Sequence, residues 1–217
     1  MAFTALGASA SNAVPQLMKM YNGNDFDYSQ RMILGSLGAT GPAASNAVPL
    51  LLRIAAKTND PALLVSIFAL GSIHSEPEKV VPLLSKWLRD PNLNVVRFFA
   101  AKSLGRFGTE ARLATSDLLE RLQDQDFQVR VNALEALARI YTKPEWNSQE
   151  PPASNMQYKP ATLVNVINGL GAMGTNAAPA VPALAKFLAD PDEGLRTSAT
   201  NALKTIDPEA AAKAGVK

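Results

Sequence analysis

The sequence contains no cysteine and only one histidine in 217 residues. The absence of cysteine excludes disulfides, zinc–thiolate sites and thiol catalysis. No run approaches 18 apolar residues, so we expect no membrane-spanning helix, and the first residues lack the basic start and long apolar stretch of a signal peptide. Aromatic residues make up only 6% of a chain that is 47% hydrophobic. Alanine supplies much of the remainder, which suits helices that pack closely through small side chains.

The sequence also lacks a large excess of charge of one sign. Its 21 basic and 19 acidic residues are spread along the chain and give a net charge of +2. Proteins that bind nucleic acids non-specifically usually carry a basic stripe. The balance therefore argues against nucleic-acid binding as the main function.

An internal repeat dominates what is present. A small residue followed by leucine, and often then by glycine, recurs at intervals of 31 to 34 residues. The leucines of this motif, here called the anchor leucines, are Leu6, Leu37, Leu70, Leu104, Leu137, Leu170 and Leu203. Self-similarity at this period is typical of repeat proteins built from pairs of helices.

Proline and glycine divide each repeat into two predicted helices. The motif Ala-Val-Pro or Val-Val-Pro at 13–15, 47–49, 80–82 and 180–182 predicts the start of a first helix, helix A, because proline is tolerated in the first turn. Asp-Pro pairs at 60–61, 90–91 and 190–191 predict its end. The second helix, helix B, contains the anchor leucine. The glycines that follow predict where helix B ends; they are Gly38, Gly41, Gly71, Gly105, Gly108, Gly171 and Gly174.

We expect helix pairs at 12–40, 45–74, 77–108, 110–141 and 177–206, with a disturbed unit at 142–174. Residues 2–7 match only the second half of a helix B, so we expect the chain to start inside a truncated repeat of a longer protein. An upstream targeting signal would then be missing, and the cytoplasm is only the default location.

The string Ala-Val-Pro-x-Leu, Asp-Pro, Val-Arg and Ala-Leu-Gly is clearest at 80–108 and 177–206. It resembles short bacterial HEAT repeats, often called phycobilisome-lyase-like HEAT repeats. The resemblance implies one all-α domain over 1–217, a right-handed superhelix of about six two-helix repeats, with helix B on its concave face. Ankyrin, tetratricopeptide and armadillo patterns fit less well.

Acid–arginine pairs recur between the two helices of a repeat: Asp90 with Arg97, Asp124 with Arg130, and Asp190 with Arg196. The resemblance implies a hydrogen-bonded ladder between neighbouring repeats. Leu63 and Leu163 take the arginine position in two repeats. A catalytic motif would not be expected several times over, so we favour the structural interpretation.

His74 is the sole histidine and follows a helix B. One histidine cannot form the His-Glu iron site of HEAT-repeat hydroxylases. A Ser-His-Asp triad stays open, although no Gly-x-Ser-x-Gly motif accompanies it. An exposed residue between repeats is the favoured interpretation.

Positions five before, two before and two after each anchor leucine lie off the apolar stripe of helix B. Those that we expect to contact a partner are Phe68, Phe99, Lys102, Arg106, Asn132, Glu135, Arg139, Asn165 and Asn168. Exposed phenylalanines beside cations would form a peptide groove. The alternative is that Phe68 and Phe99 turn inward against neighbouring repeats.

The segment 142–160 has four prolines and no helical stripe where a helix A should be. Trp146 and Tyr158 within it are either recognition residues or cover for the lost helix.

We therefore hypothesise a non-enzymatic scaffold that binds a protein or peptide through helix B and needs no cofactor or metal. A bilin lyase-like or lyase-associated role is the alternative, and a DNA-binding HEAT-like protein is the third. A designed or purely structural repeat array stays open as well, because each motif that has a physical explanation serves stacking.

Overall fold

The computed structural model describes residues 12–21, 27–122, 124–141 and 160–216, and the regular structure in these ranges is helical throughout. The expected all-α repeat fold is confirmed. The chain forms two compact units, Met1–Ala114 and Thr115–Lys217, here called unit 1 and unit 2. The truncated repeat expected at residues 2–7 lies outside the described residues.

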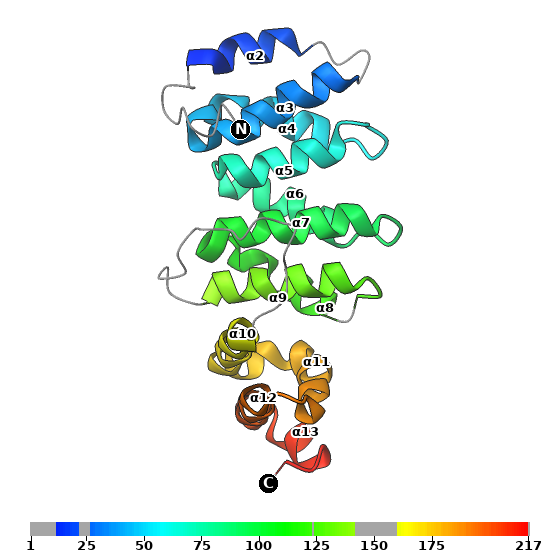
Figure 1. Cartoon of the computed structure of the whole chain (residues 1–217), viewed down its shortest axis with the longest axis vertical. Helices are drawn as coiled ribbons and strands as arrows, with labels where there is room; N and C mark the ends of the chain where they lie inside the picture. Colours follow the sequence, from blue (N-terminus) through cyan, green and yellow to red (C-terminus); the bar gives the residue numbers. More distant parts are fainter. Residues whose placement is uncertain (1–11, 22–26, 123, 142–159, 217) are drawn as a thin grey trace. The chain divides into compact units, whose positions relative to one another are not determined.

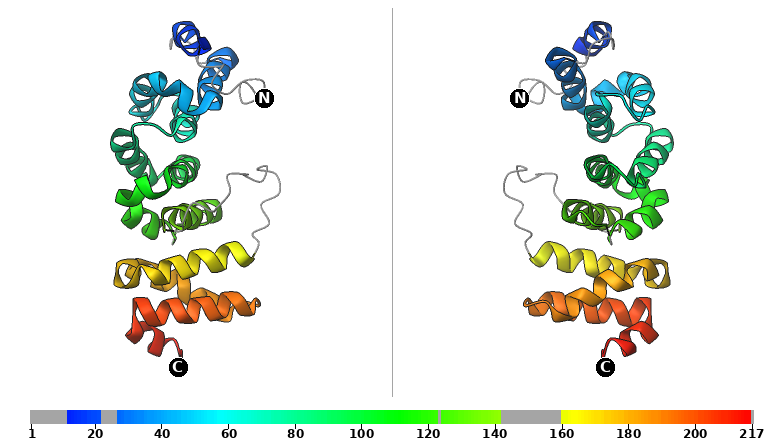
Figure 2. Two further views of the ribbon diagram at one scale, coloured as in Figure 1. Left: turned by 90° about the vertical axis from the view of Figure 1, so that its left-hand side faces the viewer. Right: turned by 90° about the vertical axis from the view of Figure 1, so that its right-hand side faces the viewer.

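In unit 1, helices of the A and B types alternate along the chain and form two layers (Figures 1 and 2). The A helices contact the B helices that follow them, and the B helices also pack side by side, α3 on α5 and α5 on α7. The A helices are α2 (Val14–Met20), α4 (Val48–Ala55) and α6 (Pro77–Leu88), and the B helices are α3 (Tyr28–Thr40), α5 (Leu63–Ile73) and α7 (Asn94–Phe107). The 3-10 helices η2 (Gly41–Ala47) and η3 (Gly108–Ala114) follow α3 and α7.

In unit 2, the B helices are α9, α10 and α12, and α10 packs on both α9 and α12. A short helix, α13, follows the last expected pair. The elements are α8 (Thr115–Arg121), α9 (Phe127–Tyr141), α10 (Pro160–Ala172), η4 (Gly174–Ala180), α11 (Val181–Lys186), η5 (Phe187–Ala189), α12 (Glu193–Ile206) and α13 (Pro208–Lys213). The segment predicted to be irregular, 142–160, lies outside the described residues except for Pro160, where α10 begins.

The anchor leucines form the repeating part of the core. Each described anchor leucine is at most 1% exposed: Leu37, Leu70, Leu104, Leu137, Leu170 and Leu203. Their burial removes a large apolar side chain from water in every repeat. The periodicity of the sequence therefore identified the core positions correctly.

The proline motif predicts the start of helix A correctly in three of its four occurrences. Pro15, Pro49 and Pro182 lie in the first turn of α2, α4 and α11. The prediction is wrong for Pro82, because α6 begins earlier, with Pro77 in its first turn, and Pro82 lies inside the helix. Pro82 is exposed, so the helix accepts it at the cost of one main-chain hydrogen bond.

The glycines near the end of helix B have two different roles. Gly41, Gly108 and Gly174 have positive φ and directly or almost directly follow α3, α7 and α10, as predicted. The glycine directly after the anchor leucine instead lies within its helix, so the prediction that it ends the helix is wrong. The glycines of this second kind are Gly38, Gly71, Gly105 and Gly171.

The second kind of glycine allows neighbouring B helices to approach closely. A Cβ atom added to Gly71 would lie 2.8 Å from the Cα atom of Ser103 on α7, and one added to Gly38 would lie 2.9 Å from the Cα atom of Ala69 on α5. In unit 2, a Cβ atom on Gly171 would lie 3.2 Å from the Cα atom of Ala202. A larger residue at these positions would push the two backbones apart.

We predict that Gly71→Ala lowers the free energy of unfolding by about 1–3 kcal/mol, because the new methyl group overlaps the backbone at Ser103. Gly35→Ala is the matched control: Gly35 also lies inside a B helix, but no atom lies within 4 Å of its added Cβ. We expect that control to raise the free energy of unfolding by about 0.4–1 kcal/mol. Urea denaturation measures both variants, and equal effects would contradict the close-contact interpretation.

Candidate functional site

Two phenylalanines from neighbouring B helices of unit 1 meet at the surface. The rings of Phe68 on α5 and Phe99 on α7 lie edge to face with their centroids 6.3 Å apart. Phe98 makes a second edge-to-face contact with Phe99 at 5.0 Å. Phe68 and Phe99 are both half-buried, so neither full exposure nor complete inward packing describes them.

Arg106 joins the two helices at the same place. Its guanidinium carbon lies 4.5 Å from the centre of the Phe68 ring, and its Nη1 atom donates a hydrogen bond to Ser72 Oγ. Ser72 and Phe68 belong to α5, whereas Arg106 belongs to α7. The cation is therefore held over the aromatic face by a second contact to the neighbouring repeat.

These residues belong to a larger surface, here called the B face. We define it by nine of the exposed or half-buried side chains on α3, α5 and α7: Arg31, Met32, Leu64, Val65, Phe68, Val95, Phe99, Lys102 and Arg106. Met32 is 50% exposed, Val95 47% and Leu64 36%. The B face thus combines accessible apolar side chains with three cations, Arg31, Lys102 and Arg106.

The predicted contact residues of unit 2 lie on α9 and α10, which pack against each other. Glu135 and Arg139 are half-buried on α9, and Asn165 and Asn168 are exposed on α10. Asn132 is the exception, because it is only 1% exposed and its Nδ2 atom donates to the carbonyl of Gln128 in its own helix. The prediction that Asn132 contacts a partner is therefore wrong. The position of a residue around its helix does not show whether atoms of neighbouring elements cover it.

Trp146 and Tyr158, the aromatic residues predicted to take part in recognition, lie outside the described residues.

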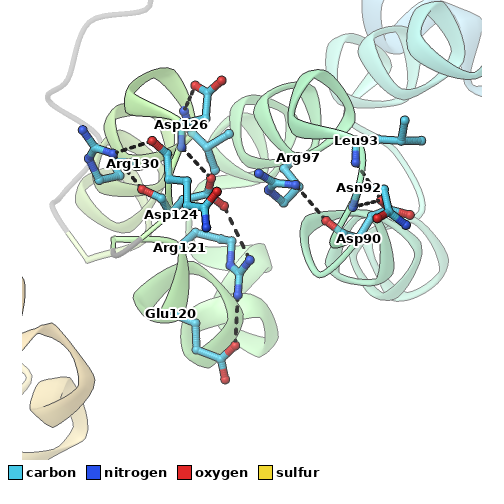
Figure 3. A network of polar contacts seen from close by, with 11 residues as sticks. Asp90, Asn92, Leu93, Arg97, Glu120, Arg121, Asp124, Asp126 and Arg130 are labelled. Carbon is cyan, nitrogen blue, oxygen red and sulfur yellow. Dashed lines mark hydrogen bonds and ion pairs between the residues drawn. The ribbon is translucent and has the colours of Figure 1, made fainter.

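The acid–arginine pairs close the turn between helices A and B of one repeat (Figure 3). Arg97 Nη1 donates to the carbonyl of Asp90 at 3.0 Å, and Arg130 Nη1 donates to the carbonyl of Asp124 at 2.7 Å. The Asp90 carboxylate accepts the N–H groups of Asn92 and Leu93.

The same bonds recur at the end of unit 2. Arg196 Nη1 donates to the carbonyls of Asp190 and Pro191, and the Asp190 carboxylate accepts the N–H of Asp192. The expected ladder between repeats is therefore wrong for this pair, which acts within its own repeat. The turn exposes several main-chain polar groups, and a neighbouring guanidinium satisfies two of them at once.

His74 occupies a position that glycine holds in other repeats. It follows α5 with φ of 50°, four residues after its anchor leucine, as Gly41, Gly108 and Gly174 do after theirs. Its Nε2 atom lies 2.8 Å from Glu110 Oε2 in η3, and its ring contacts Phe107. His74 is thus an exposed residue between repeats, as the sequence indicated.

Two hydrogen bonds between repeats were not found from the sequence. Trp87 is buried in α6 and its Nε1 atom donates to the carbonyl of Ala55 in α4, at 2.7 Å. Ser103 Oγ donates to the carbonyl of Ile67 in α5, at 3.0 Å. The hydrogen bond of Trp87 could have been anticipated from the sequence, because a buried indole N–H needs an acceptor.

The described part of the chain contains no group of three or more histidine, cysteine, aspartate or glutamate residues placed to hold a metal ion. Among the described helices, none has the length and apolar character required to cross a membrane.

Comparison with known proteins supports the fold. Residues 63–138, which run from α5 into α9, match the family model of HEAT repeats. The search of curated proteins found no match.

Two solved structures of repeat proteins are similar. One is an engineered protein studied by the Northeast Structural Genomics Consortium, 18% identical with a TM-score of 0.59; the match covers 98% of this chain and 65% of that one. The other is a designed armadillo repeat protein, 17% identical with a TM-score of 0.56, with 89% of this chain and 100% of that one covered. These structures support an armadillo-like helical repeat fold for the chain, and within it residues 63–138 are similar to HEAT repeats.

The hydrogen bonds that close the turn before α12 predict that two substitutions in this helix differ in their effect on stability. Arg196→Ala removes the donors to the Asp190 and Pro191 carbonyls, so we expect the free energy of unfolding to fall by about 1–2 kcal/mol. Lys204→Ala, at an exposed position of the same helix, should change it by less than about 0.5 kcal/mol. Urea denaturation distinguishes the two, and an Arg196→Ala variant as stable as the control would contradict the role of the turn bonds.

The left-handed backbone at His74 predicts that two substitutions of this residue differ in stability. His74→Gly and His74→Ala both remove the imidazole contacts, but alanine must keep the left-handed φ of 50°. We expect the alanine variant to be less stable by about 1 kcal/mol. Thermal unfolding measures both, and equal midpoints would show that this φ carries no cost.

Proposed function

We propose that this chain is a non-enzymatic interaction scaffold that binds a protein or peptide segment on the B face of unit 1. One observation carries the proposal: Phe68, Phe99 and Arg106, from two successive repeats, form one half-buried cluster at the surface. Aromatic and arginine side chains contribute most of the binding energy in many protein interfaces.

The construction of the cluster also favours binding. Phe68 and Phe99 are held against each other, and Arg106 is fixed over Phe68 by its bond to Ser72. Side chains that are already ordered lose less conformational entropy when a partner binds. The accessible apolar neighbours Met32, Leu64 and Val95 extend the surface along all three B helices of unit 1.

Similarity to designed and engineered repeat proteins supports a scaffold, since helical repeats of this type present extended surfaces to partners. In unit 2, Glu135, Arg139, Asn165 and Asn168 could extend the contact area of that unit. Their exposure alone gives no comparable cluster, so unit 1 is the primary proposal.

We predict that peptides enriched by panning a phage-displayed library of random peptides against the full chain lose affinity when both phenylalanines are truncated. The double variant Phe68→Ala with Phe99→Ala should bind at least about tenfold more weakly, roughly 1.4 kcal/mol, because both rings contribute contact area. Fluorescence anisotropy with a labelled synthetic peptide measures the change.

The matched control replaces two exposed apolar side chains that lie outside the B helices. Met20 on α2 is 58% exposed and Leu113 in η3 is 82% exposed. The double variant Met20→Ala with Leu113→Ala should bind as the natural chain does. Enriched peptides that bind both double variants equally well would contradict binding on the B face.

A further inference from the structure

The three B helices of unit 1 carry no acidic residue. The sequences of α3, α5 and α7 contain Arg31, Arg97, Lys102 and Arg106 but neither aspartate nor glutamate. The described acidic residues of unit 1 lie on other elements, in helix A, in 3-10 helices or at the turns; they are Asp27, Asp60, Glu76, Glu78, Asp90 and Glu110. The near-neutral net charge of the chain conceals this separation.

The cations of these helices lie beside the apolar side chains. Lys102 and Arg106 are half-buried on α7 and Arg31 is exposed on α3, whereas Arg97 is buried and belongs to its turn. Among the described residues, Lys102 forms no ion pair. A carboxylate brought to this surface would therefore meet cations without meeting a competing acid on the same helices.

The spacing of the helices restricts the shape of a partner. The helices α3, α5 and α7 pack side by side, as Figure 1 shows. Packed helix axes lie about 8–10 Å apart, and an extended chain advances about 3.3 Å per residue, so roughly three residues of a partner pass each helix. A segment that crosses all three B helices has about seven to nine residues.

We propose that the partner is an extended acidic peptide segment, with apolar side chains about three residues apart and carboxylates between them. The apolar side chains pack on Phe68, Phe99 and the neighbouring Met32 and Val95. The carboxylates pair with Lys102, Arg106 and Arg31. This inference rests on the proposed function and adds the chemical class of the partner.

The test starts from peptides enriched by panning the full chain and sequences them. We expect an excess of aspartate and glutamate over the unselected library. One enriched peptide is then synthesised with a fluorescein label in three forms: as selected, with every acid changed to the matching amide, and with every acid changed to lysine. The amide form should bind about tenfold more weakly and the lysine form more weakly still, and added salt should weaken the acidic form most.

Charge-reversal variants locate the contact. Lys102→Glu with Arg106→Glu should weaken binding of the acidic peptide by about tenfold or more, because two attractive contacts become repulsive. The control, Arg53→Glu with Lys57→Glu, changes the net charge equally on α4 and the turn that follows it. It should leave the affinity within about twofold, since exposed charges at a distance are screened by salt.

The outcomes separate the inference from the proposed function. Peptides that need Phe68 and Phe99 but are neutral or basic, or that bind equally well as amides, would overturn the acidic partner while the proposed function stands. Peptides whose binding is independent of both phenylalanines would overturn both. Enriched acidic peptides that are weakened by Lys102→Glu with Arg106→Glu and by salt, but not by the control pair, would support the inference.

Discussion

The close approach of successive B helices is the constraint on which the rest of the structure depends. At Gly38 and Ala69, at Gly71 and Ser103, and at Gly171 and Ala202, small residues bring two helix backbones nearly into contact. The anchor leucine just before each of these glycines is buried at the same level. Packing of this kind fixes the register of one repeat on the next, because a shift along the helix would place a larger side chain against the backbone.

The surface chemistry follows from that register. Phe68 and Phe99 meet because α5 and α7 are held close at Gly71 and Ser103, and Arg106 reaches Ser72 across the same interface. The turn bonds of Arg97, Arg130 and Arg196 act more locally, since they close the connection between the two helices of one repeat. Stacking and turn closure are thus carried by separate residues.

The features that repeat along the chain could be predicted from the sequence. The anchor leucines recur every 31 to 34 residues and are buried, and the all-α repeat fold follows from that pattern. Periodicity does not show which neighbour a residue meets. It therefore misassigned Gly71 as a helix end, treated Asn132 as exposed and placed the contacts of Arg196 between repeats rather than within one.

Departures from the repeat were also difficult to predict, for physical reasons. The motif at Pro82 resembles a helix start, but Pro77 five residues earlier satisfies the same preference. His74 stands where other repeats have glycine, and only the backbone shows that it adopts a left-handed φ. The charge separation of unit 1 needed the helix boundaries, since composition alone reports a balanced chain.

Binding of a partner on the B face of unit 1 is tested most directly by a titration followed by nuclear magnetic resonance. Backbone amide signals of the full chain would be followed while an enriched acidic peptide is added. We expect the largest shifts on α3, α5 and α7, centred on Phe68, Phe99 and Lys102. Shifts centred on the A helices α4 and α6, with the B helices unchanged, would contradict this expectation.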